Sequence, residues 1–386
     1  MMPAAPAAEP AEPAPPTSLG ELARVFLQLG LTSFGGPAAH IARMEEEIVR
    51  RRGWLTHAEL LDLIGASQLI PGPNSTELAI HIGLRRRGWP GLVVAGACFI
   101  VPAALLVGAL AWAYVRWGTR PGAAALFRGV KPVIIAIVAR ALWGLGRTAL
   151  RTPRQAVIAL AALAVAPRMH ELLLLLLAGA ASTLPTLRPR GRRAGALALP
   201  ALSALPALTA AVAAPFSLGA LFLLFVKIGA VLYGSGYVLL AFLRADLVER
   251  RGWLTEGQLL DAVAAGQVTP GPVFTTATFV GYLLGGAAGA TVATLGIFLP
   301  AFVFVALSGA LIPRIRAHPS AAAFLDGVNA ASLALMAWVT LELARAALVD
   351  VPTVLIAAAS LAILSLARVS SVWLLLAGAA IGMWMR

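Results

Sequence analysis

Charged residues are scarce in this chain, and their scarcity decides the class of protein. Only 12% of the 386 residues are Asp, Glu, Lys or Arg, whereas 60% are hydrophobic. A soluble domain is about one quarter charged. Apolar stretches at 91–115 and 286–312 are long enough to cross a bilayer, which takes roughly 20 residues. The sequence therefore predicts a polytopic membrane protein.

Several other absences exclude particular folds and functions. Cysteine occurs only at Cys98, which excludes an intramolecular disulfide. The alternating ten-residue segments of a transmembrane barrel are missing, so the fold is predicted to be all-α. No G-x-x-x-x-G-K-[ST] motif occurs, so this chain is not expected to hydrolyse ATP. All but two of the 30 basic residues are Arg in short loops between apolar segments, a pattern typical of membrane edges and not of nucleic-acid binding.

No enzyme chemistry, metal or cofactor is predicted. An intramembrane hydrolase is the alternative, because Gly234-Ser235-Gly236 resembles a serine turn. A serine nucleophile needs a base, and the first His of the second half is His318, beside Pro319 in an expected loop. We therefore predict no catalytic residue.

The chain divides into four segments. Residues 1–18 are rich in Pro and Ala and lack the basic start and apolar core of a signal peptide, so they are expected to be a disordered cytoplasmic tail. Two membrane repeats are expected at 19–187 and 215–386. Between them, 188–214 begins with the basic sequence RPRGRR and continues as a possible extra apolar segment. The positive-inside rule places this linker in the cytoplasm.

An internal duplication relates residues 26–149 to 225–347. RRGWLT occurs at 51–56 and 250–255, and Q-x-x-P-G-P occurs at 68–73 and 267–272, both pairs at an offset of 199 residues. The sequence thus predicts two homologous halves. Five crossings in each half would make the repeats inverted and an even number would make them parallel, and the loop charges do not decide between these.

A short helix is predicted before each Pro-Gly-Pro. Thr56 and Thr255 fit capping boxes, and the helices that they start run about 14 residues, roughly 21 Å, before Pro71 and Pro270. This length is too short to cross. Proline ends the helix and glycine accepts unusual dihedral angles, so we predict a broken, re-entrant hairpin in each half. Such breaks are tolerated only when buried or beside a cavity, and in repeats they mark a transporter's substrate site.

Polar residues surround these breaks. A helix start offers free N–H groups and the positive end of the helix dipole, which favour an anion; the alternative is that the hydroxyls and Asn merely cap a helix. The candidate substrate-binding residues here are Gln68, Pro71, Gly72, Pro73, Asn74, Ser75 and Thr76 in the first half and Gln267, Pro270, Gly271, Pro272, Thr275 and Thr276 in the second.

A second glycine-rich break occurs in each half, at residues 34–37 and 233–236, and supplies further candidates. It forms either a backbone nest for an anion or a simple sharp turn. Lys227, in an apolar helix, either lines the pathway or snorkels to the interface. His40 and Arg43 have apolar counterparts in the second half, so the site is expected to be asymmetric. The additional candidates are Gly35, Gly36, His40, Arg43, Lys227, Gly234 and Ser235.

Three carboxylates are candidates for proton coupling. Asp62 and Asp261 occupy the same repeat position, and Glu77 follows the first break. A carboxylate in apolar surroundings can carry a proton, and pairing with a nearby Arg is the alternative. His81 is interpreted as an interfacial surface residue because basic residues follow at 85–87.

The paired motifs carry a family likeness. FGGPAAHIARMEEEIVRRRGWL followed by QLIPGP, with YGSG, RRGWL and QVTPGP in the second half, resembles the chromate ion transporter family in its long two-domain form. The likeness covers residues 20 to 385. Residues that match the family's motifs are Gly35, Gly36, Pro37, His40, Gln68, Pro71, Gly72 and Pro73, then Gln267, Pro270, Gly271 and Pro272. Pro37 has no counterpart, because the second half has Gly236.

This resemblance implies a multi-pass protein of the bacterial cytoplasmic (inner) membrane, with halves in opposite orientation. It implies export of chromate, chromate resistance, and sulfate as a competitor. Moving a dianion out of a negative cell interior is favoured by about 4.6 kcal/mol per 100 mV, so gradients or membrane potential suffice as the driving force. A transporter of sulfate or another anion and an anion channel remain the alternatives. A homodimer is possible, although the glycine spacings indicate no dimer face.

Overall fold

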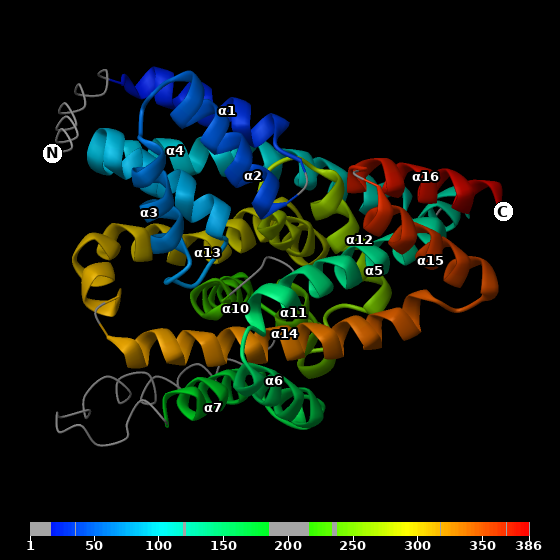
Figure 1. The fold of residues 1–386 in the computed structure, drawn as a ribbon. Coiled ribbons are helices and arrows are strands. Elements are labelled where there is room, and N and C mark those ends of the chain that lie inside the picture. Colours follow the sequence, from blue (N-terminus) through cyan, green and yellow to red (C-terminus); the bar gives the residue numbers. More distant parts are fainter. Residues whose placement is uncertain are drawn as a thin grey trace, which may run out of the picture.

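The computed structural model describes residues 17–34, 36–118, 121–184, 216–233, 238–316, 318–367 and 369–385. Helices and their connections make up these residues, and no strand occurs among them (Figure 1). The all-α prediction is therefore confirmed. The predicted linker and most of the predicted tail lie outside the described residues, as do Gly35, Gly234 and Ser235.

The two halves present matching series of helices. Half one comprises α1 (Leu19–Thr32), α2 (Pro37–Met44), η1 (Glu45–Arg51), α3 (His57–Ser67), α4 (Asn74–Trp117), α5 (Pro121–Ala149), α6 (Pro153–Val165) and α7 (Glu171–Thr183). Half two comprises α10 (Leu218–Val231), α11 (Leu239–Leu243), η4 (Arg244–Arg250), α12 (Glu256–Val268), η5 (Val273–Thr275), α13 (Thr276–Arg316), α14 (Pro319–Ala347), α15 (Val351–Leu366) and α16 (Ser371–Trp384).

The short helices begin where the sequence predicts. Thr56 accepts a hydrogen bond from the Glu59 amide at 3.2 Å, and the Glu59 carboxylate accepts one from the Thr56 amide at 2.9 Å. Thr255 and Gln258 make the same pair of bonds in half two. Each capping box satisfies two amides that a helix start leaves free. Both predicted capping boxes are confirmed.

The long helix α4 is a hairpin with two arms. Arg87 and Gly88 leave helical geometry, with Gly88 at φ 60°, so a short arm (74–86) and a long arm (89–117) meet at a sharp turn. Arg85, near the outer end of the short arm, pairs with Glu59 near the start of α3 at 3.4 Å. The short arm therefore returns alongside α3, and the Pro-Gly-Pro corner lies at the inner tip between them. This is the predicted re-entrant hairpin.

Half two repeats the arrangement. Gly285 and Gly286 break α13 into a short arm (276–284) and a long arm (287–316). Glycines allow the arms to touch: a Cβ on Gly83 would lie 2.2 Å from the carbonyl oxygen of Gly91, and one on Gly281 would lie 2.3 Å from that of Gly289. Only hydrogen fits at these contacts.

The long arms of α4 and α13 pack against each other in opposite directions. Gly96 faces Phe302, whereas Gly108 lies against Thr278, whose hydroxyl is bonded to that of Thr294 at 2.7 Å. Residues later in the long arm of α4 therefore lie beside residues earlier in the long arm of α13. This antiparallel pairing is what inverted repeats require.

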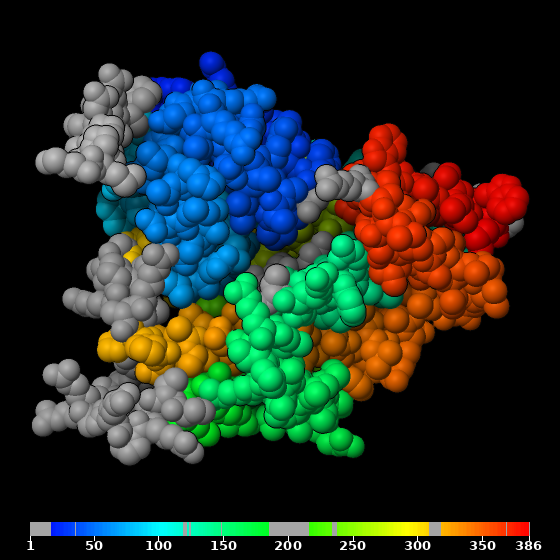
Figure 2. Space-filling model, in the orientation of Figure 1, coloured from blue at the N-terminus to red at the C-terminus, as the bar shows by residue number. Residues whose placement is uncertain are grey.

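The last two helices of each half pack on the other half. Helices α15 and α16 lie on α5, while α6 and α7 lie on α14 (Figure 1). Gly129 of α5 touches the backbone of Gly378 in α16, and Gly179 of α7 lies under the ring of Phe324 in α14. In the space-filling view the orange and red residues of α15 and α16 lie directly against the blue-green residues of α5 (Figure 2). The halves are therefore interlocked.

Among the described residues, three helices are long and apolar enough to span a membrane: Asn74–Trp117, Val273–Ser308 and Pro319–Ala347. The apolar stretches predicted to span, 91–115 and 286–312, coincide with the long arms of α4 and α13. Helices α6, α7, α10, α15 and α16 are apolar but shorter, with 13 to 16 residues each. At 1.5 Å per residue they cover about 20–24 Å, less than a full crossing.

The hairpin contact predicts that Gly83→Leu destabilises the protein. The new side chain would meet backbone, which cannot move aside as a side chain can, so we expect a loss of about 1–3 kcal/mol or more of unfolding free energy. Thermal unfolding in detergent measures this. Gly20→Leu is the matched control, because no atom lies within 4 Å of a Cβ on Gly20. Equal melting temperatures for the two variants would contradict the hairpin.

Candidate functional site

Each Pro-Gly-Pro corner is hydrogen-bonded to the opposite half. The Gly72 amide donates to the carbonyl oxygen of Leu232 at 2.8 Å, and the Gly271 amide donates to that of Ser33 at 2.9 Å. Leu232 follows the end of α10 and Ser33 follows the end of α1. Both the donors and the acceptors are separated by 199 positions, so the two bonds are counterparts. We call them the reciprocal bonds.

Glycine is required at both corners. Gly72 has φ 139° and Gly271 has φ 88°, a region that side chains disfavour. A Cβ on Gly72 would also lie 2.2 Å from Oε1 of Glu77, and one on Gly271 would lie 2.8 Å from Cβ of Ala103. Ala301 of α13 lies beside Gly72 as Ala103 of α4 lies beside Gly271. Both corners are therefore buried against the paired long arms.

A chain of polar groups leads from the Gly271 corner into half one. His40 is 1% exposed, with Nε2 at 3.1 Å from the Ser33 carbonyl oxygen and Nδ1 at 3.1 Å from Oγ of Ser75. A carbonyl can only accept, so Nε2 carries the proton and, in the neutral ring, Nδ1 accepts from the Ser75 hydroxyl. His40 thus fixes Ser75 at the start of α4.

The short arm of α4 continues with buried polar groups that lack hydrogen-bond partners. Thr76 and Glu77 are 0% exposed and His81 is 5% exposed. Within the described residues, the Thr76 hydroxyl, both Glu77 carboxylate oxygens and His81 Nε2 have no hydrogen-bond partner. Buried polar groups are nearly always bonded, so this cluster indicates a place for a ligand, water or proton. The interpretation of His81 as a surface residue was wrong, because its helix turns inward beside the long arm.

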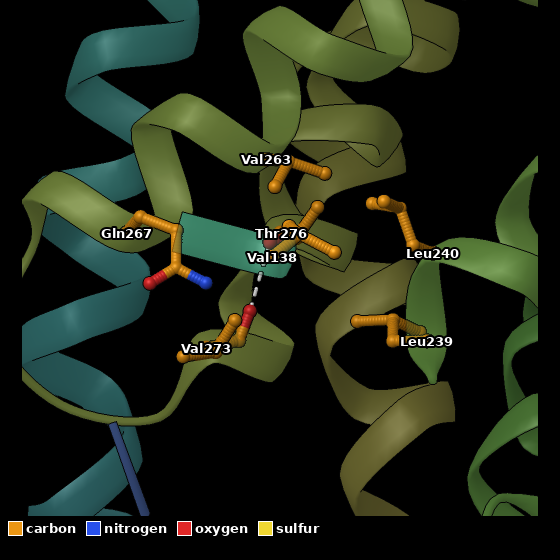
Figure 3. Close-up of a pocket in the computed structure, with 7 residues that line it drawn as sticks. All are labelled: Val138, Leu239, Leu240, Val263, Gln267, Val273 and Thr276. Carbon is orange, nitrogen blue, oxygen red and sulfur yellow. Dashed lines mark hydrogen bonds between the residues drawn. The ribbon is translucent and has the colours of Figure 1, made fainter. Parts of the chain in front are cut away.

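The corresponding region of half two is less polar, and Val138 of α5 in half one also borders it. A small pocket is lined by Val138, Leu239, Leu240, Val263, Gln267, Val273 and Thr276 (Figure 3). Leu239 replaces His40, and the hydroxyls of Thr275 and Thr276 donate to backbone carbonyls at 2.8 Å. Gln267 is buried, and its Nε2 lacks a partner among the described residues. The expected asymmetry is therefore visible, with the polar chain in half one.

The remaining sequence candidates lie either away from the corners or within them. Gln68 is exposed, and Arg43 donates to the Thr32 hydroxyl at 3.1 Å on an exposed surface. Gly36, at φ 80°, immediately precedes α2, and Pro37 is the first residue of that helix. Pro71 and Pro73 are buried and Asn74 is half-buried, as the corner requires. Pro270 and Pro272 are buried in the half-two corner.

Lys227 is held in a buried ionic network. Its Nζ lies 2.5 Å from Asp246, which also pairs with Arg250 at 2.8 Å. Arg250 in turn pairs with Glu171 of α7, so the network ties the two halves together. Asp246 is 0% exposed, and its charge offsets that of Lys227. The sequence reasoning missed this network, because its members are spread over α7, α10 and η4.

The three candidate proton carriers differ in their surroundings. Asp261 is buried, pairs with Lys131 at 3.3 Å and accepts a hydrogen bond from Tyr114 at 2.9 Å. Asp62 is exposed. Glu77 is the one that is fully buried and lacks a hydrogen-bond partner among the described residues.

Comparison with known proteins finds the same family in each of the two halves. The family model described as chromate transporter matches residues 20–183 and again residues 219–383. A chromate transport protein of Cupriavidus metallidurans is 33% identical over 373 residues, covering 94% of this chain and 92% of its own length. A chromate transport protein of Pseudomonas aeruginosa is 34% identical, covering 87% and 83%. A probable chromate transport protein of Synechococcus elongatus is 32% identical, covering 88% of each. No solved structure matches this chain.

The polar chain predicts the effect of His40→Leu, which introduces the half-two residue. Ser75 would lose its acceptor in a buried place, so we expect a loss of about 1–3 kcal/mol in unfolding free energy. Adding Ser75→Ala should recover part of this loss, because it removes the stranded hydroxyl. Chemical denaturation of the single and double variants measures the coupling.

His57→Leu is the control for this substitution. His57 is largely exposed at the start of α3, so its replacement should change stability by no more than about 0.5 kcal/mol. Strictly additive effects of His40→Leu and Ser75→Ala would argue against the bond between these residues.

Proposed function

Because the chain belongs to the chromate transporter family, we propose that it exports chromate across the bacterial cytoplasmic membrane as a secondary transporter and so confers chromate resistance. The main support is the pair of Pro-Gly-Pro corners, buried against the long arms and bonded to the opposite half. Broken helices at matching places of two repeats are the usual framework of a transporter's substrate site.

The proposed anion site lies at the start of α4. A tetrahedral dianion needs hydrogen-bond donors and positive potential, and a helix start provides both without burying a full positive charge. The Gly72 and Gly271 amides are already donating to carbonyls in this structure, so they are not the free donors. The donors that we propose are the amides of Asn74 and Ser75 at the start of α4, together with the buried Thr76 hydroxyl, which has no hydrogen-bond partner among the described residues. The Thr76 and Glu77 amides already donate to the Pro73 carbonyl.

Access to this site is proposed to alternate through the reciprocal bonds. A typical hydrogen bond contributes about 0.5–1.5 kcal/mol net, so two of them can be exchanged for bonds to substrate or water at a cost that binding can offset. Releasing them would free each corner from the opposite half. The exchanged helix pairs α6–α7 and α15–α16 would keep the halves joined during the movement.

The membrane potential is proposed to drive export. Each unit charge that crosses gains about 2.3 kcal/mol per 100 mV, so an outward-moving dianion gains about 4.6 kcal/mol. Sulfate has the same shape and charge as chromate, and donors of the kind present here do not distinguish the two ions. We therefore propose sulfate as a competitor.

Chromate uptake into everted membrane vesicles tests the proposal, because export becomes accumulation in this orientation. We predict saturable uptake that sulfate inhibits and that collapse of the potential reduces. Gly72→Ala and Gly271→Ala should each lower the initial rate about tenfold or more, since both the backbone angle and the contacts oppose a side chain, and about 1.4 kcal/mol corresponds to tenfold.

Gly53→Ala is the matched control. Gly53 also has a positive φ, 58°, yet no atom lies within 4 Å of its Cβ position, so this variant carries the backbone strain without the contact. Flux without saturation would indicate a channel, and accumulation of sulfate without chromate would indicate another substrate. Undiminished rates in both corner variants would remove the corners from the mechanism.

A further inference from the structure

Glu77 occupies an unusual position in half one. Its side chain is 0% exposed, and neither carboxylate oxygen has a hydrogen-bond partner in the described residues. Oε1 lies beside the Gly72 corner, 2.2 Å from where a Cβ would stand. The residue is in the first turn of α4, the place proposed for the anion.

The groups around Glu77 do not neutralise a negative charge. Tyr233, at the break after α10, lies close enough to interact electrostatically with it. His81 is one turn further along α4, and His40 of α2 bonds to Ser75. Charged groups on neighbouring helices are engaged elsewhere: Glu59 of α3 with Arg85, and Asp261 of α12 with Lys131.

An ionised carboxylate in such a place is strongly disfavoured, because burial removes its hydration and no cation replaces it. The protonated acid is tolerated far better and gains a hydrogen-bond donor. The positive end of the α4 dipole would attract an ionised Glu77, but the carboxylate would cancel the positive potential that the dipole offers to an oxyanion and would repel the ion held there. A neutral Glu77 removes that repulsion.

We propose that Glu77 is the site of a proton that binds together with the oxyanion: burial favours the protonated acid, and an anion at the start of α4 favours it further. At an alkaline pH that ionises Glu77 in the anion-free protein, the carboxylate therefore takes up a proton when the anion binds and releases it when the anion leaves. The anion part of this inference rests on the proposed function. One proton leaving with a dianion reduces the net charge moved per cycle from two to one. The proton part stands on the burial and isolation of Glu77.

Infrared difference spectroscopy tests the proton site directly. Spectra of the purified protein in lipid nanodiscs, recorded between alkaline and neutral pH, should show the C=O stretch of a protonated carboxyl group. Glu77→Gln should remove this band. Glu46→Gln, which neutralises an exposed carboxylate of η1, should leave it unchanged.

Proton uptake on binding tests the linkage. Chromate is added to the weakly buffered protein at an alkaline pH at which the infrared spectrum shows Glu77 to be ionised, and the pH change is followed alongside binding. Because chromate itself takes up protons near neutrality, the difference between variants is the informative quantity. Glu77→Gln should still bind chromate and take up about one proton fewer per bound anion, whereas Glu46→Gln should match the unaltered protein.

The outcomes separate the two proposals. If the unaltered protein and Glu77→Gln show the same carboxyl region of the spectrum, Glu77 is not the proton site. Chromate binding with equal proton uptake in Glu77→Gln would overturn the linkage. The band without any chromate binding would overturn the proposed function and leave the proton site standing. If Glu77→Gln does not fold, Glu77→Asp keeps an acid on a shorter chain, and it should shift the band; an unshifted band would assign it to another residue.

Discussion

The structure depends on satisfying the backbone where two helices of each half are broken. At membrane depth an unbonded amide or carbonyl costs several kcal/mol, since no water replaces the lost partner. Proline removes two donors from each corner, so the glycine amide is the donor that needs an acceptor. The acceptor is a carbonyl freed where the first helix of the other half ends, at Ser33 or Leu232. Each half therefore supplies what the break in the other lacks, and neither corner could be buried alone.

The shared framework carries different chemistry in its two copies. In half one, His40 and Ser75 extend the bond at Ser33 toward the start of α4, where Glu77 lies. In half two, leucine replaces the histidine, and Thr275 and Thr276 satisfy their hydroxyls on nearby carbonyls. The two halves therefore share the corner bonds but differ in polarity, and the polar chain lies in half one.

Local signals predicted much of this fold. Thr56 and Thr255 mark helix starts through contacts three residues away, and the Pro-Gly-Pro corners follow from the backbone limits of those residues, so the re-entrant hairpins could be anticipated. No prediction placed a turn at Gly88, although Gly88 follows three arginines and precedes Trp89-Pro90, and glycine and proline so close together are signals of a turn. The pairing of Lys227 with Asp246, the exchange of α15 and α16 onto α5, and the isolation of Glu77 depend on packing between distant segments, which no local pattern records.

The central claim is that the start of α4, between the reciprocally bonded corners, holds the oxyanion. A crystal structure of the chromate complex, with the ion located by the anomalous scattering of chromium, tests it most directly. The account predicts a chromium peak beside Ser75 and Thr76, enclosed by both corners. A peak elsewhere in the protein, or corners that face lipid with the ion bound, would contradict it.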